Sequence, residues 1–82
     1  MRIQLVYPAR LTKGHDGYAV TFRDVPEAQS AGRSKSEARE MAADALRTAI
    51  EFYLEERRAF PLPSKMEEGE FPVLLQRPLQ AS

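Results

Sequence analysis

The 82-residue chain contains no cysteine, and this absence excludes several kinds of chemistry. Disulfide bonds, thiol catalysis and cysteine-ligated zinc are ruled out, which fits a protein of the reducing cytoplasm. The chain also lacks any apolar run near the ~20 residues that a membrane-spanning helix needs. No apolar stretch of the kind found in signal peptides follows its first basic residue. We therefore expect a single cytoplasmic domain without membrane contact.

The chain also has no formal net charge at pH 7, because its twelve Lys and Arg residues balance its twelve Asp and Glu residues. The two signs are unevenly spread: residues 1–39 carry seven basic and four acidic side chains, and residues 40–82 carry five and eight. A nucleic-acid-binding protein concentrates basic residues on one face. We therefore expect no direct nucleic-acid binding. The acidic second half suits either a basic protein partner or a plain solvated surface.

Catalytic and metal sites find little support in the sequence. A two-metal nuclease needs several converging carboxylates, but the one acid at the end of a predicted strand is Asp24, with Glu27 in the turn that follows. His15 is the only histidine, and it falls in a predicted hairpin loop without a second ligand or a nearby serine. We predict no catalytic residue, no metal site and no cofactor. Asp24 is expected to cap the turn at Val25 and Pro26 by hydrogen bonds to the backbone.

One long amphipathic helix is the strongest structural signal, from Ser34 to about Arg58. Ser34 and Glu37 fit an S-x-x-E capping box, in which each side chain satisfies a backbone N–H at the open helix end. The apolar residues that recur at steps of three and four are Ala38, Met41, Ala42, Ala45, Leu46, Ala49, Phe52 and Tyr53. This spacing predicts one buried stripe, and its alanines should let the helix approach a sheet closely.

Strand patterns surround this helix. The segments predicted as strands are residues 3–12, 18–22, 28–32 and 71–76. The turn residues 13–17 join the first two strands into an antiparallel hairpin. Pro8 cannot donate to a ladder, so the first strand should lie at an edge there or carry a bulge. Gly32 is expected to give the backbone freedom to turn before the helix.

The order of these elements predicts an α+β fold of the form β-β-β-α-β, with the helix packed on one face of an antiparallel sheet. This domain should span residues 1–78, followed by a disordered tail at 79–82. After the helix, Phe60 and Leu62 lie in a proline-rich extended segment and are expected to rest on the core.

The run from Gly17 to Ala28, GYAVTFRDVPEA, resembles the G-Y-x-V-x-F-x-D-[IVL]-P signature of the HicB family of bacterial antitoxins. The residues that continue the resemblance, in order and with matching spacing, are Gly32, 36–38, 52–55 and 61–64. The resemblance covers roughly residues 3–75. Each piece has low specificity alone, but the ordered set is difficult to reproduce by chance.

The resemblance implies an antitoxin of a HicA–HicB toxin–antitoxin system. Its partner would be a HicA-type mRNA-interferase toxin, a small basic protein that cleaves RNA with a histidine, and the antitoxin would cover that active site. The resemblance also implies a partial ribonuclease H-like fold without a working metal site. Longer members add a C-terminal DNA-binding domain, which has no room here, so the chain is either a naturally short member or a fragment.

With one helix on one face, the second sheet face or a sheet edge is left open and is the expected docking surface for a toxin, a second copy or both. The residues predicted to contact a partner are Arg10, Thr12, Thr21, Arg23, Asp24, Val25 and Pro26. A domain this small has a thin margin of stability, which favours a homo-oligomer, either a dimer or a tetramer. Two alternatives stay open: an orphan self-associating protein without a toxin, and a truncated transcriptional autorepressor.

Overall fold

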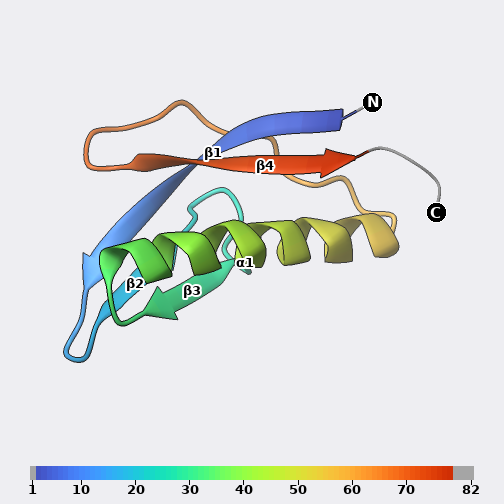
Figure 1. Ribbon diagram of the computed structural model, residues 1–82. Coiled ribbons are helices and arrows are strands. Elements are labelled where there is room, and N and C mark those ends of the chain that lie inside the picture. Colours follow the sequence, from blue (N-terminus) through green and yellow to red (C-terminus); the bar gives the residue numbers. More distant parts are fainter. Residues whose placement is uncertain (1, 79–82) are drawn as a thin grey trace.

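The computed structural model describes the backbone of residues 2–78 and the side chains of residues 5–75, so the tail predicted at 79–82 lies outside the described residues. The elements are β1 (Arg2–Lys13), β2 (Tyr18–Thr21), β3 (Gln29–Gly32), α1 (Lys35–Glu55) and β4 (Phe71–Pro78). Neighbouring strands all pair antiparallel, in the order β3-β2-β1-β4. Figure 1 shows α1 lying along one face of the sheet. The predicted α+β fold is confirmed.

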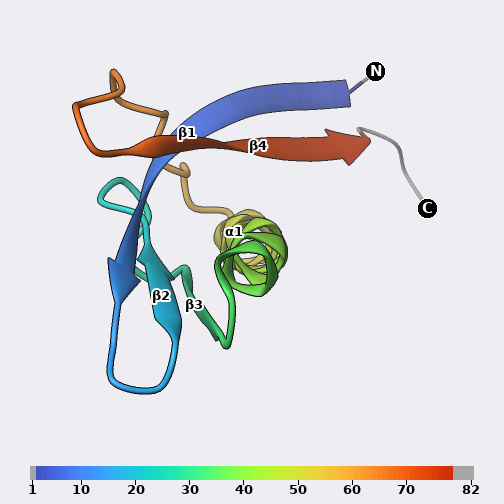
Figure 2. The same cartoon turned by 60° about the vertical axis from the view of Figure 1, so that its left-hand side comes forward.

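β1 is long because it pairs with two neighbours in turn. Its residues 2–9 pair with β4, and its residues 10–13 pair with β2. Figure 2 shows β1 bending between these two partners. Pro8 therefore has a paired strand on one side only, and it faces Pro72 across that ladder. The prediction that Pro8 lies at a local edge is confirmed.

The core lies between α1 and the sheet face that carries the odd-numbered residues of β1. Its largest fully buried side chains are Tyr7, Val20, Phe22, Leu46, Ile50 and Leu75. Each such burial stabilises the fold by about 1.5–3 kcal/mol relative to an exposed side chain. Two members of the predicted helical stripe are not buried: Met41 is 48% exposed and Phe52 is 59% exposed. They lie about three turns apart on one flank of α1, outside the narrower stripe that contacts the sheet.

The N-terminus of α1 follows the predicted capping pattern with one difference. The backbone N–H of Glu37 donates to Ser34 Oγ at 3.1 Å, as predicted. The Glu37 carboxylate accepts from the N–H of Arg33 at 2.7 Å, one residue earlier than a capping box predicts. Both bonds satisfy backbone donors at the helix entrance, and they fix where α1 begins.

Gly32 has a different role from the one predicted. Its φ is not positive, so it does not supply a special turn conformation. A Cβ at this position would lie 2.5 Å from the backbone nitrogen of Ala38 and 2.9 Å from its Cα. The Ser30 hydroxyl also donates to the Ala38 carbonyl, at 3.2 Å. Gly32 is therefore required by the close approach of β3 to the first turns of α1.

The helix ends at Glu55, before the predicted end near Arg58. The N–H of Arg58 donates to the Tyr53 carbonyl at 2.9 Å, and the N–H of Arg57 donates to the Leu54 carbonyl at 3.1 Å. Arg57 adopts a left-handed conformation with φ of 58°. This pair of bonds is a Schellman motif, in which glycine usually occupies the left-handed position. The usual glycine signal for the helix end is therefore missing from the sequence.

The connector, residues 56–70, carries the chain from the end of α1 to the start of β4. The Tyr7 hydroxyl donates to the Pro61 carbonyl at 2.7 Å on the helix side of the sheet. Figures 1 and 2 show the connector crossing β1 to the side away from α1 before β4 begins. Phe60 packs against the core as predicted, but Leu62 is 71% exposed because the connector leaves the core after Pro61.

Candidate functional site

The sheet face opposite α1 is open where β1 meets β2. Arg10 lies directly opposite Thr21, and Thr12 lies opposite Ala19. Arg10, Thr12 and Thr21 are all exposed. Side chains alternate between the two faces of a strand, so these three lie together on the face that the helix does not cover. The structure thus brings three of the predicted contact residues onto one surface.

A hollow of about 210 Å³ borders this open face. Its lining residues are Arg10, Thr21, Phe22, Arg23, Pro26, Gln29 and Glu70. Arg23 forms a bidentate pair with Glu70, through Nε at 2.8 Å and Nη2 at 3.2 Å. Nη2 also donates to the Lys65 carbonyl at 2.5 Å. Arg23 therefore holds the second half of the connector against the sheet.

Glu70 is the acceptor at the centre of this arrangement, and its side chain is only 2% exposed. It also accepts from the N–H of Glu67 at 2.8 Å, and Arg10 lies 4.0 Å away. The hydrogen bond from Arg23, followed by the one from the Glu67 backbone, lowers the pKa of the Glu70 carboxyl. The carboxylate is thus ionised at neutral pH. This role could not be predicted, because no local pattern links Glu70 to Arg23, which lies 47 positions earlier in the bend after β2.

Asp24 also binds the connector, which corrects the role predicted for it. Its carboxylate accepts from the Ser64 N–H at 2.7 Å and from the Ser64 hydroxyl at 2.5 Å. The turn that Asp24 was expected to cap is closed by the backbone instead, with Ala28 N–H donating to the Val25 carbonyl at 2.9 Å. Burial, and then the charge of Asp24, raise the pKa of the nearby Tyr7 hydroxyl.

The predicted contact residues therefore separate by burial. Val25 is fully buried in the core, so its side chain cannot reach a partner, whereas Pro26 is exposed beside the hollow. The connector adds exposed apolar side chains that were not among the predicted contact residues. Leu62 is 71% exposed and Met66 is 38% exposed. Charged neighbours follow Met66, with Glu67 and Glu68 both exposed.

A second contact network holds the end of α1 to the loop before β3. The Tyr53 hydroxyl donates to the Glu27 carboxylate at 2.7 Å, and the Arg58 guanidinium lies 4.5 Å from the centre of the Tyr53 ring. The hydrogen bond from Tyr53 lowers the pKa of Glu27. These groups thus have a structural role, since they join the end of α1 to the loop before β3.

The described residues contain no candidate metal site, because no group of three or more His, Cys, Asp and Glu side chains among them could hold an ion. His15 is exposed in the loop between β1 and β2. As for membranes, α1 is not apolar enough over its length to cross a bilayer, and residues 2–78 contain no other helix that is.

Comparison with known proteins gives consistent results. A family model described as the HicB_like antitoxin of bacterial toxin–antitoxin systems matches residues 6–80. Antitoxin HicB 2 of Photorhabdus laumondii is 47% identical over 63 residues, and antitoxin HicB of Escherichia coli K12 is 48% identical over 61 residues. These alignments cover 77% and 73% of this chain but 45% and 44% of the relatives, so the chain spans less than half their length.

A solved structure has a similar fold. A chain from the HicA3 and HicB3 toxin–antitoxin complex matches with a TM-score of 0.62 at 24% identity. The match covers 87% of this chain and 95% of that chain. At this identity the similarity establishes the arrangement of the helix and strands, and it extends over nearly all of both chains.

Proposed function

Because the chain belongs to the HicB-like family of antitoxins of bacterial toxin–antitoxin systems, we propose that it neutralises a HicA-type, RNA-cleaving toxin by binding over the toxin's active site. The family match over residues 6–80 carries this proposal, since it includes most of β1 and every later element. A family described as antitoxins also supports the prediction that the chain is not an enzyme. Inhibition is then stoichiometric, takes place in the cytoplasm and needs no cofactor.

We assign toxin contact to the open face of β1 and β2 together with the connector. Arg10, Thr12 and Thr21 present exposed side chains from paired strands, which hold them in fixed positions. Leu62 and Met66 add exposed apolar surface on the connector. A surface with apolar groups surrounded by polar ones is typical of protein interfaces.

Charge supports the choice of a basic partner. Arg23 and Glu70 are paired with each other, so neither presents an unpaired charge to a partner. Glu68 is exposed, and the Glu67 side chain is 65% exposed although it lies 3.9 Å from Arg23. These acidic groups would attract the small basic toxin that the resemblance implies.

Arg23 and Asp24 act by positioning the connector. Each is bonded to a connector residue, so their replacement should displace the connector and weaken toxin binding indirectly. Val25 contributes through the core alone. This division separates contact residues, whose variants fold normally, from positioning residues, whose variants also lose stability.

The experiment is RNA cleavage by the cognate toxin, titrated with this chain. Cleavage should stop at a fixed molar ratio of the two proteins. Thr21→Arg should raise the inhibition constant at least tenfold, because it places a bulky cation on the open face, and tenfold corresponds to about 1.4 kcal/mol. Thr48→Arg is the matched control, because Thr48 is exposed on α1.

Two results would count against these assignments. If cleavage continues in molar excess of the chain and no complex forms on gel filtration, the chain is not sufficient as the antitoxin. If wild type inhibits but Thr21→Arg and Thr48→Arg titrate alike, the toxin binds elsewhere on the domain.

A further inference from the structure

A polar row crosses three strands of the open sheet face and lies along the hollow described above. Arg10 of β1 lies opposite Thr21 of β2, and Thr21 lies opposite Gln29 of β3. All three residues are exposed, and all three line the hollow of about 210 Å³. Residues directly opposite each other on neighbouring strands have their side chains side by side on one face. The row therefore brings together a guanidinium, a hydroxyl and a side-chain amide, each of which can donate a hydrogen bond.

Glu70 leaves the donors of Arg10 available, because both of its carboxylate oxygens already accept hydrogen bonds from other groups. Arg23 donates to both oxygens, and the Glu67 N–H donates to Oε1. Arg10 Nη2 lies 4.0 Å from Glu70 Oε2, which is too far for a hydrogen bond, and this is its one ion pair among the side chains of residues 5–75. The Arg10 side chain is 51% exposed, so its N–H groups can bind a partner.

The guanidinium of Arg10 lies in a defined place beside the connector. A Cβ added to Gly69 would lie 3.1 Å from Arg10 Nη1, so the guanidinium lies close to the backbone there. Gly69 has a φ of 88°, a conformation that glycine adopts readily. Because Arg23 and Glu70 hold this end of the connector to the sheet, the neighbours of Arg10 are held as well. A group that its neighbours already restrict loses little freedom on binding, which favours specific recognition.

Charge and size indicate what the hollow can bind. Its lining carries two guanidinium groups, from Arg10 and Arg23, and the carboxylate of Glu70, so one positive charge is in excess. Small-molecule pockets usually enclose about 300–1,000 Å³, so this hollow is small for a free ligand and suits one side chain of a larger partner. A guanidinium binds a carboxylate through two parallel N–H···O bonds. An RNA phosphate fits less well, because the exposed Glu67 carboxylate lies 3.9 Å from Arg23 and would repel the neighbouring phosphates.

We propose that this hollow binds one aspartate or glutamate side chain of the toxin, and that Arg10 recognises its carboxylate. Thr21 and Gln29 donate further hydrogen bonds from the same row. The inference rests on the proposed function, because it names the group of the toxin that the open face receives. A positive site beside the acidic groups of the connector requires an acidic side chain at the matching place on the toxin. The hollow therefore determines the orientation in which the two proteins bind.

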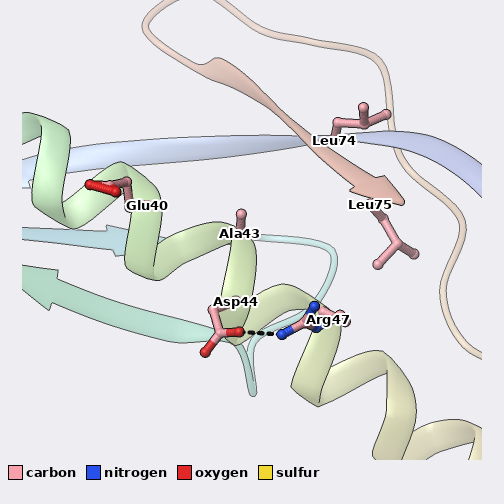
Figure 3. Close-up of a pocket in the computed structure, with 6 residues that line it drawn as sticks. All are labelled: Glu40, Ala43, Asp44, Arg47, Leu74 and Leu75. Atoms are coloured by element: carbon pink, nitrogen blue, oxygen red, sulfur yellow. Dashed lines mark hydrogen bonds and ion pairs between the residues drawn. The ribbon is translucent and has the colours of Figure 1, made fainter. Parts of the chain in front are cut away.

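Inhibition of RNA cleavage by the cognate toxin, measured with variants of Arg10, tests the proposal. Arg10→Met removes the donors of the side chain but keeps its apolar stem, so it should raise the inhibition constant about tenfold or more. Arg10→Lys keeps the charge without the planar fork, and it should recover only part of this loss. Arg47→Met is the matched control, since the Arg47 side chain is 54% exposed and is paired with Asp44 on the flank of α1 (Figure 3). It should inhibit like wild type.

A charge exchange separates recognition from any effect of Arg10 on folding. Arg10→Glu should weaken toxin binding, and each Asp and Glu of the toxin is then replaced by Arg, one at a time. One of these toxin variants should bind Arg10→Glu more tightly than it binds wild type, a preference that a purely structural role of Arg10 cannot produce. Binding is measured by calorimetry, so that a toxin variant without activity is still informative, and circular dichroism confirms that each variant is folded.

Three results would overturn the proposal. If Arg10→Met inhibits as well as Arg47→Met, the Arg10 guanidinium does not contact the toxin. If no toxin variant prefers Arg10→Glu, no carboxylate occupies the hollow. If the chain alone binds the toxin's RNA substrate and Arg10→Met abolishes that binding, the hollow takes a phosphate instead. Failure of wild type to inhibit the toxin at all is a different result, because it refutes the proposed function and this inference together.

Discussion

Replacing Gly32 by alanine tests whether the close approach of β3 to α1 controls the stability of this domain. The added Cβ would lie 2.5 Å from the Ala38 nitrogen, 2.9 Å from the Ala38 Cα and 2.9 Å from the carbonyl carbon of Glu37. All three are backbone atoms, so no change of side-chain rotamer can relieve the contacts. The first turn of α1 must therefore move away from the sheet.

Two effects of opposite sign set the magnitude. Alanine restricts the unfolded chain, which stabilises by about 0.4–1 kcal/mol where the native backbone accepts it, and Gly32 has no positive φ. Adding a methyl group to a packed contact costs about 1–3 kcal/mol, and rigid backbone neighbours place this case near the upper limit. The net loss should therefore be about 2–2.5 kcal/mol. In a domain of this size each kcal/mol lowers the Tm by about 4–8 °C.

Gly14→Ala provides the matched control. A Cβ on Gly14 would have its nearest neighbour at 3.6 Å, the carbonyl oxygen of Gly17, and the φ of Gly14 is not positive. This variant should be as stable as wild type or more stable by up to about 1 kcal/mol. Thermal and urea unfolding, followed by circular dichroism, measure both variants. If Gly32→Ala melts at or above the temperature of Gly14→Ala, close packing does not explain the glycine.

Three further substitutions test other contacts, each by the same unfolding measurements. Arg57→Gly should stabilise by about 0.5–1 kcal/mol, because glycine adopts the left-handed conformation without a Cβ clash, and a lower Tm would contradict this. Tyr7→Phe should destabilise by about 0.5–1.5 kcal/mol through loss of the bond to Pro61, so an unchanged urea midpoint would refute that bond's role. The pKa of Glu70 is lowered in the folded state, so its stabilisation is present above its unfolded pKa near 4.5 and is lost as the pH falls through the folded value. Glu70→Gln should therefore be less stable than wild type at pH 7 and converge with it in acid, and a constant difference at every pH would exclude this linkage.

The order and type of the elements could be predicted because their signals are local. The capping residues Ser34 and Glu37 locate the start of α1, and alternating side chains identify β1 and β2. The end of α1 could not be placed, because Arg57 occupies the position where glycine usually marks a Schellman motif. Phe52 is exposed because the sheet covers only a narrow stripe of the helix. The width of that stripe cannot be predicted from the spacing of apolar residues along α1.

The candidate surface could be predicted only in part. Alternation along the strands correctly placed Arg10, Thr12 and Thr21 together on the open face. The contacts that hold the connector were beyond sequence reasoning. Arg23 and its partner Glu70 are 47 positions apart, and Asp24 binds a residue 40 positions away, so no periodic pattern relates them.

The pairing of β1 with β4 ties completion of the fold to the order of synthesis. β1 leaves the ribosome before β4 and lies between β2 and β4 in the sheet, and residues 2–9 of β1 pair with residues 71–78. Pairing between residues so far apart in the sequence slows folding, because the loop between residues 9 and 71 must close before the ladder can form. A nascent chain therefore exposes one side of β1 until β4 emerges. A product truncated before residue 71 would leave Leu5 and Tyr7 beside an unfilled strand position, and would be open to proteolysis.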